Sequence, residues 1–158
     1  LTIRPVRPDD ARQHEAFFYR LPPEDVRLRF FALLRELTPA QLAKFTRPDY
    51  ERDMALIAVR EMTGETVGVA RLMREKDPLV SEFAVVVQPD MQGKGLATHL
   101  LHLLFGWARM HGVREVVGEI LPENERMLRL AQHLGFRLRH APGDPGIIEA
   151  RLPLLPTA

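Results

Sequence analysis

The 158-residue chain contains no cysteine. Without thiols it can form neither disulfides nor zinc–thiolate sites, and no cysteine can serve as a nucleophile in catalysis. An excess of charge is also missing, since 22 Lys and Arg residues stand against 21 Asp and Glu residues. Nucleic-acid binding depends on a basic excess, so we expect no nucleic-acid partner.

Long apolar runs are missing as well. The first residues lack the apolar core of a signal peptide, and no later segment is long enough to cross a bilayer as a helix. We therefore expect a cytoplasmic protein with no membrane partner.

The pattern of apolar residues predicts one α/β domain with three layers and a mixed sheet, which covers residues 1–152 and leaves a loose tail at 153–158. An almost continuous apolar run at 82–87 indicates a central strand that is buried on both faces. Strand, helix, strand and helix follow one another in the second half, which indicates parallel pairing there. The predicted strands are 2–7, 55–60, 66–73, 82–87, 115–121, 136–139 and 147–152, and the predicted helices are 11–20, 23–34, 39–45, 96–111 and 124–134.

A glycine-containing turn lies between the apolar strand 82–87 and the longest helix. Its residues are Gln92, Gly93, Lys94, Gly95, Leu96 and Ala97. The glycines allow a tight turn with several N–H groups directed the same way, and the helix dipole adds positive charge there. We expect these backbone amides to bind a pyrophosphate, with Lys94 as a helpful but dispensable cation. Alone, a Gly-x-Gly turn is as often structural as functional.

In its context this turn resembles the signature of the GNAT acetyltransferase superfamily, a strand followed by Gln/Arg-x-x-Gly-x-Gly/Ala and a helix. Gln92, Gly95 and Ala97 match that signature. Asn124 with Gly135-Phe136 is similar to a second GNAT landmark, and the resemblance covers essentially the whole chain.

Three further segments resemble the acetyltransferase domain of bacterial Pat-type protein lysine acetyltransferases. They are Asp49 to Ala58, Ser81 to Val87 and Asn124 to Leu128. That resemblance implies a protein lysine as acceptor, such as one on an acyl-CoA synthetase. It also implies fusion to an acyl-CoA synthetase-like region, which would explain a chain that starts at Leu1.

The GNAT resemblance implies acetyl-CoA as cosubstrate and a central sheet splayed between strands 82–87 and 115–121. Backbone groups of Val85 and Val87 would then bond pantetheine, and an N–H near Val86 would polarise the thioester carbonyl. Asn124 would reach toward the pantetheine arm. No metal is implied.

Glu82 is the candidate catalytic base. A lysine ammonium, with a pKa near about 10.4, must lose a proton before its nitrogen can attack a thioester. Glu82 aligns with the glutamate that serves as base in many protein-acetylating GNAT domains, and it shares a strand face with Ala84 and Val86. The alternative is an ordinary exposed carboxylate at a strand end.

One position departs from the wider family. Many GNAT enzymes have a tyrosine seven residues after the asparagine as general acid, whereas this chain has Ala131. A thiol with a pKa of about 8.5 can leave without a dedicated acid. The departure nevertheless keeps a non-catalytic acetyl-CoA sensor open, beside an enzyme for small amines such as polyamines or aminoglycosides.

Three other residues carry weaker hypotheses. His99 and His102 lie one helical turn apart, which suits a metal, but no third ligand is apparent and a solvated helix face is favoured. Tyr50 either lines the acceptor channel or belongs to the core.

Overall fold

The computed structural model describes residues 1–30 and 38–155. The last residues of the predicted helix 23–34 lie outside this range. Within it, the helices are α1 (Ala11–Arg20), α2 (Pro23–Phe30), α3 (Pro39–Thr46), α4 (Leu96–Met110) and α5 (Glu125–His133), with short 3-10 helices η1 (Pro8–Asp10) and η2 (Pro89–Met91). Most bounds agree with the predicted ones within one or two residues.

In the described part of the chain, seven strands form one sheet in the order β1-β2-β3-β4-β5-β7-β6. The β4–β5 pairing is parallel and the other pairings are antiparallel, which confirms the predicted mixed sheet. The strands are β1 (Thr2–Pro5), β2 (Met54–Val59), β3 (Thr66–Arg74), β4 (Val80–Val87), β5 (Glu115–Ile120), β6 (Arg137–Ala141) and β7 (Asp144–Pro153). Helix α4 makes the crossover that a parallel pair requires.

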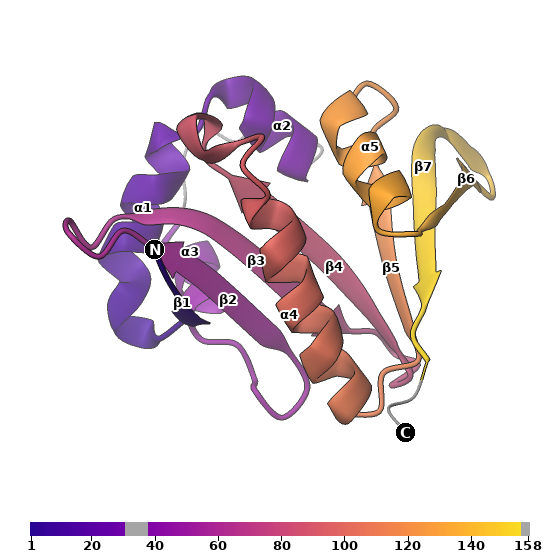
Figure 1. Cartoon of the computed structure of the whole chain (residues 1–158), viewed down its shortest axis with the longest axis horizontal. Helices are drawn as coiled ribbons and strands as arrows, with labels where there is room; N and C mark the ends of the chain where they lie inside the picture. The colour runs from indigo at the N-terminus through magenta and orange to yellow at the C-terminus, as the bar shows by residue number, and fades with distance from the viewer. Residues whose placement is uncertain (31–37, 156–158) are drawn as a thin grey trace.

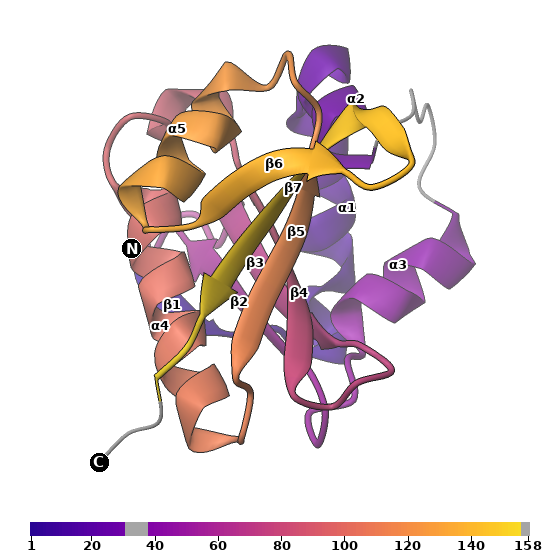
Figure 2. The ribbon, with the colours of Figure 1, turned by 90° about the vertical axis from the view of Figure 1, so that its right-hand side faces the viewer.

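The helices cover the two faces of the sheet and make three layers (Figures 1 and 2). On one face, α4 and α5 enclose the larger core, which contains Phe83, Leu100 and Leu104. On the other face, α1, α2 and α3 enclose a smaller core around Phe17 and Ile57. The sheet is therefore buried from both sides, although β4 is only half-buried on the side of α1 to α3.

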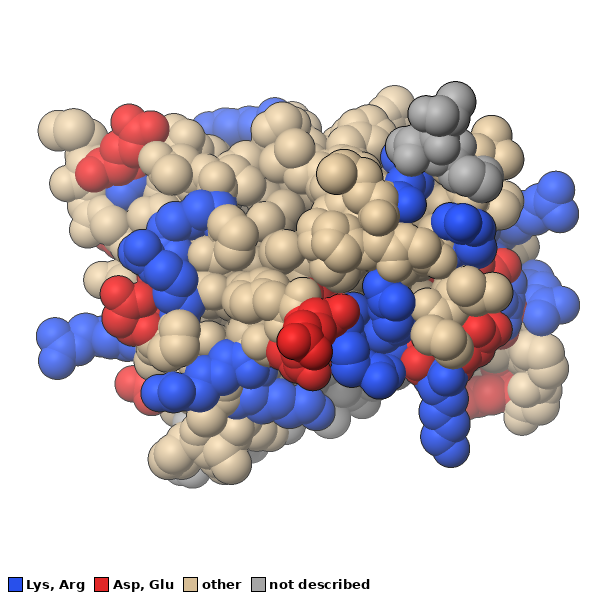
Figure 3. Space-filling view, turned by 90° about the horizontal axis from the view of Figure 1, so that it is seen from below, with Lys and Arg blue, Asp and Glu red and all other residues tan. Residues whose placement is uncertain are grey.

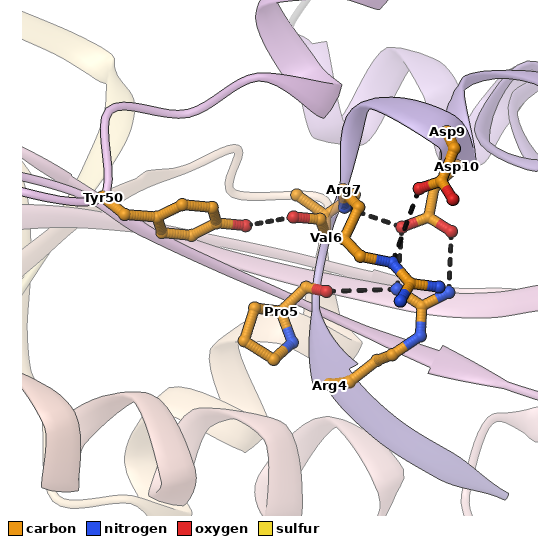
Figure 4. A network of polar contacts seen from close by, with 7 residues as sticks. All are labelled: Arg4, Pro5, Val6, Arg7, Asp9, Asp10 and Tyr50. Carbon is orange, nitrogen blue, oxygen red and sulfur yellow. Dashed lines mark hydrogen bonds and ion pairs between the residues drawn. The ribbon is translucent and has the colours of Figure 1, made fainter.

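The start of the chain is held by an ion pair between Arg4 and Asp10. Asp10 makes no side-chain cap bond to α1. Its carboxylate instead accepts hydrogen bonds from the Arg4 guanidinium at 2.7 and 2.8 Å and from the Arg7 N–H at 2.7 Å (Figure 4). The sequence Pro8-Asp9-Asp10 before the helix predicts an aspartate cap on α1. This prediction is wrong, because η1 precedes the helix and Asp10 faces back toward β1.

Replacing Asp10 with Asn should cost about 1.5 to 3 kcal/mol of unfolding free energy, because a charge-assisted bidentate bond is lost in a buried place. The hydrogen bond from Arg4 lowers the pKa of Asp10 below its usual value near about 3.9. Stability from the ionised carboxylate is therefore present above that value and lost as the pH falls through the folded pKa. Urea unfolding of both proteins from neutral pH downward measures this: the difference should shrink below about pH 4.

Asp9→Asn is the matched control. Asp9 also faces an arginine, but its side chain is 76% exposed, so its loss should cost less than about 1 kcal/mol. Equal effects of the two substitutions would contradict a special role of the Arg4–Asp10 pair.

The far end of the chain is more ordered than expected. The Leu154 side chain is buried in the larger core, and its N–H donates to the Arg114 carbonyl at 2.8 Å. The expectation of a loose tail from residue 153 is therefore wrong for Leu154, since β7 runs through Pro153 and carries the next residue into the core.

On the face of the molecule seen from below, basic and acidic side chains are interspersed (Figure 3).

Candidate active site

Strands β4 and β5 separate along their length. Their parallel pairing includes Glu82 with Val117 and ends there, although β4 continues to Val87 and β5 to Ile120. Figure 1 shows the two strands close together at the bottom and apart at the top, beside the start of α4. The splay implied by the GNAT resemblance is thus present in this chain.

The register of β3 and β4 decides which backbone groups of β4 face this gap. The Gln88 N–H donates to the Val67 carbonyl, so Gln88 and Val67 form a hydrogen-bonded antiparallel pair. Because such pairs alternate along the strands, the Val86 N–H is directed to Val69 of β3, whereas Val85 and Val87 are directed toward β5. An oxyanion donor was expected near Val86. The Val86 N–H itself is directed to β3, so the neighbouring N–H groups of Val85 and Val87 are the ones that face the gap.

The N-terminus of α4 forms a turn with several N–H groups that bond no other described residue. Gly93 and Gly95 have φ angles of +77° and +81°, which residues with a Cβ rarely adopt. The N–H groups from Gly93 to Ala97 form no hydrogen bond within the described chain, as expected at the start of a helix. The Gln92 N–H does bond, to the Pro89 carbonyl at 3.2 Å. The predicted row of donors therefore begins at Gly93 and not at Gln92.

The gap and the turn border one cavity of about 520 Å³. The strand residues Glu82, Val85, Val86 and Val87 line it, and so do Gln92, Gly93, Gly95, Leu96, Ala97 and Asn124. The structure thus brings together nearly all the predicted site residues. Lys94 is the exception: it is exposed and does not line the cavity.

Glu82 lies on the face of β4 opposite to α4. Phe83, Val85 and Val87 belong to the core beneath α4, so the alternating residues Glu82, Ala84 and Val86 point to the side of α1 to α3. The Glu82 residue is half-buried and lines the cavity on that side. The turn at the α4 N-terminus and the Glu82 carboxylate therefore border the gap from opposite faces of the sheet.

Two amide side chains shape the cavity. The Gln92 side chain donates to the Val87 carbonyl at 2.9 Å and to Asp25 of α2 at 3.4 Å, so it joins the end of β4 to α2. The Asn124 side chain caps α5, because its Oδ1 accepts from the Met127 N–H at 3.2 Å. The amide nitrogen of Asn124 keeps its donor capacity for a ligand.

Phe83 fills the gap near the point where the strands part. A Cβ added at Gly118 of β5 would lie 2.3 Å from the Phe83 ring, which itself packs against Phe136 with centroids 5.0 Å apart. Glycine at this position therefore lets the Phe83 ring lie across β5 as part of the cavity wall.

Gly118→Ala should destabilise the fold by about 1 to 3 kcal/mol, because the added methyl group overlaps the Phe83 ring and forces it out of its packing against Phe136. Thermal or urea unfolding would measure the loss. Shortening the ring in Gly118→Ala/Phe83→Leu should recover part of it. A double variant less stable than the sum of the two single variants would contradict the clash as the cause.

An ion pair joins the two walls of the cavity. Arg27 of α2 donates to Glu123, just before α5, at 2.9 Å and to Glu24 at 2.7 Å. Hydrogen bonds from its own backbone N–H and from Arg27 lower the pKa of Glu123. Because both carboxylates are exposed, the ion pair contributes little to stability.

Other predicted residues lie elsewhere. Ala131 is buried in the core and supplies no acid. Tyr50 does not line the cavity; its hydroxyl donates to the Val6 carbonyl (Figure 4), and burial raises the pKa of this phenol.

His99 and His102 are exposed on α4. No group of three or more potential metal ligands lies together among the described residues. Nor does any described helix combine the length and apolarity needed to cross a membrane.

Four polar residues that line the cavity were not predicted: Asp25, Thr98, Glu119 and Arg126. The strand pattern could have indicated Glu119. In β5 the apolar residues Val116 and Ile120 alternate with Glu115, Val117 and Glu119, so the side of Glu119 follows once the core side is known. Asp25 carries no such signal, because its place depends on how α2 packs.

Comparisons with known proteins agree with this geometry. A family profile described as an acetyltransferase (GNAT) domain matches residues 1–137. The acetyltransferase PA5475 of Pseudomonas aeruginosa is 32% identical over 154 residues, which are 96% of this chain and 83% of that protein. The acetyltransferase Pat of Mycolicibacterium smegmatis is 27% identical over 134 residues, which are 84% of this chain but only 40% of that protein.

Solved structures have the same fold. The GNAT domain of S. lividans PAT superposes with a TM-score of 0.89 at 27% identity, over 96% of this chain and 89% of that one. The yncA acetyltransferase of Salmonella typhimurium, solved with acetyl-CoA, has a TM-score of 0.74 at 22% identity, over 99% of this chain and 95% of that one. From the matching profile, the 32% identical relative and the splayed sheet we conclude that the chain belongs to the GNAT acetyltransferase family.

Proposed function

We propose that this domain transfers the acetyl group of acetyl-CoA to a lysine side chain of a protein, with Glu82 as the base. The observation that supports this most strongly is that one cavity is lined both by Glu82 and by the N-terminus of α4. A thioester in the gap would therefore have its phosphates at a positive helix end and its acetyl group near a carboxylate. The resemblance to Pat-type domains supports lysine as the acceptor.

In the proposed reaction the neutral amine attacks the thioester carbonyl directly. Glu82 first removes one proton from the bound ammonium. The N–C bond then forms, the C–S bond breaks, and the departing CoA thiolate takes up the second proton of the amine. The N–H groups of Val85 or Val87 are the β4 amides suited to the oxyanion, since their strand positions face the gap. Asn124 would donate to the pantetheine arm.

A small cationic amine is the second candidate acceptor. It is favoured by the charge of the cavity, whose described lining includes the carboxylates Asp25, Glu82 and Glu119 against one cation, Arg126. Such a lining attracts any ammonium group, whether it belongs to a protein or to a free polyamine.

Acetyl-CoA turnover with a panel of acceptors separates these candidates. The panel contains an acyl-CoA synthetase, lysine peptides and free polyamines, and the release of CoA thiol is followed beside mass spectrometry of the product. Acetylated lysine in protein or peptide supports the proposal. Turnover confined to polyamines would replace it with the second candidate, and acetyl-CoA binding without any turnover would identify a sensor.

A further inference from the structure

Glu119 of β5 lies across the gap from the proposed base. Val116 and Ile120 point into the core beneath α4, so Glu119 points to the other side of the sheet, the side of Glu82. Glu82 pairs with Val117, and Glu119 lies two residues further along β5 toward the open end. At the rise of a strand this is about 7 Å beyond the pairing position. Both carboxylates line the same cavity.

The other carboxylates on this face of β5 and β7 are engaged, whereas Glu119 is not. Glu149 accepts from Arg151 at 2.6 Å and from Arg139 at 3.1 Å, and Glu115 accepts from Arg151 at 2.5 Å. Glu119 is exposed and makes no hydrogen bond or ion pair with any residue in the described ranges. It therefore retains its full capacity to bind a cation in the cavity.

Packing gives no reason for a carboxylate at this position. Glu119 lies directly opposite Glu149 in the antiparallel β5–β7 pair, and like charges that face each other across strands are unfavourable. The two arginines on Glu149 relieve part of this repulsion, but no cation of the described chain contacts Glu119. A cationic ligand would supply the missing partner.

We propose that Glu119 binds the ammonium group of the incoming acceptor and guides it to Glu82. This inference rests on the proposed function and adds the residue that selects a cationic amine. Glu119 stabilises the charged form of the amine and therefore contributes to binding, whereas Glu82 receives the proton in the reaction. The two carboxylates should consequently affect different kinetic constants.

Steady-state kinetics with acetyl-CoA and a lysine peptide test this division. In Glu119→Gln, we expect the KM for the peptide to rise about tenfold, with kcat and the KM for acetyl-CoA changed less than about twofold. The rise should shrink as the pH approaches the lysine pKa of about 10.4, because the neutral amine gains nothing from a carboxylate. Glu119→Asp should recover part of the affinity.

Glu125→Gln is the matched control. Glu125 is exposed at the start of α5, lies outside the cavity lining and should leave all constants unchanged. An unchanged peptide KM in Glu119→Gln would overturn the inference, and so would a loss confined to kcat or an equal rise in the KM for acetyl-CoA. These results leave the proposed function standing, whereas a wild-type domain that acetylates no lysine would contradict the proposed function itself.

Discussion

Glu82→Gln should reduce kcat for lysine acetylation by about 10²- to 10⁴-fold, because the amine then loses the group that removes its proton. Glutamine keeps the size of the side chain and one hydrogen-bond acceptor but cannot take up a proton at neutral pH. The Kd for acetyl-CoA should stay unchanged, since the proposed cosubstrate contacts come from β4 backbone and the α4 N-terminus. A steady-state assay of CoA release gives kcat, and titration calorimetry gives the Kd for acetyl-CoA.

The pH dependence separates a base from a merely structural carboxylate. The remaining activity of Glu82→Gln should rise steeply with pH, because hydroxide and the growing fraction of neutral amine replace the missing base. A variant with wild-type kcat would remove Glu82 from the mechanism. A variant with normal stability but no acetyl-CoA binding would assign it to the cosubstrate site.

The double substitution Gly93→Ala/Gly95→Ala should weaken acetyl-CoA binding by about 100-fold. Each alanine would pay about 1 to 2 kcal/mol to keep a positive φ, and a free-energy loss of 1.4 kcal/mol corresponds to a tenfold change in Kd. If the turn relaxes instead, its N–H groups no longer point the same way. No neighbouring atom lies within 4 Å of either added Cβ, so the effect would come from the backbone rather than from a clash.

Gly106→Ala controls for the loss of a glycine in the same helix. Gly106 lies within α4, has no positive φ and has nothing within 4 Å of an added Cβ. Alanine there should stabilise the helix by about 1 kcal/mol and leave the Kd unchanged. Equal affinity of the double variant and the wild type would show that the turn does not hold the cosubstrate.

Local sequence signals predicted the secondary structure well. The pattern of apolar residues gave α1 its bounds. Threonine before a proline favours a helix cap, and Thr38 does cap α3, accepting from the Gln41 N–H at 3.2 Å. Strand β7 begins at Asp144, earlier than the predicted Ile147, because residues 144–146 are polar or small and carry no apolar pattern. The insertion of β7 between β5 and β6 is a long-range arrangement that no local pattern encodes.

In the candidate site, too, local features could be predicted from the sequence and long-range features could not. The turn from Gly93 to Ala97 could be located from the sequence, because its glycines lie between a strand and a helix and match a family signature. The direction of the Val86 N–H could not, because it depends on the register of β4 against β3. Glu119 was not predicted because it belongs to no motif. It lines the cavity only because β4 and β5 separate before they reach it.

The most direct test of the acetyl-CoA site is a titration of the isotopically labelled domain with CoA, followed through its backbone amide NMR signals. We predict that the largest shifts fall on Gly93 to Ala97 and on Val85, the amides at the α4 N-terminus and in the gap. Shifts confined to another surface, such as the β6–β7 edge, with these signals unmoved, would contradict the proposed binding of acetyl-CoA between β4 and β5.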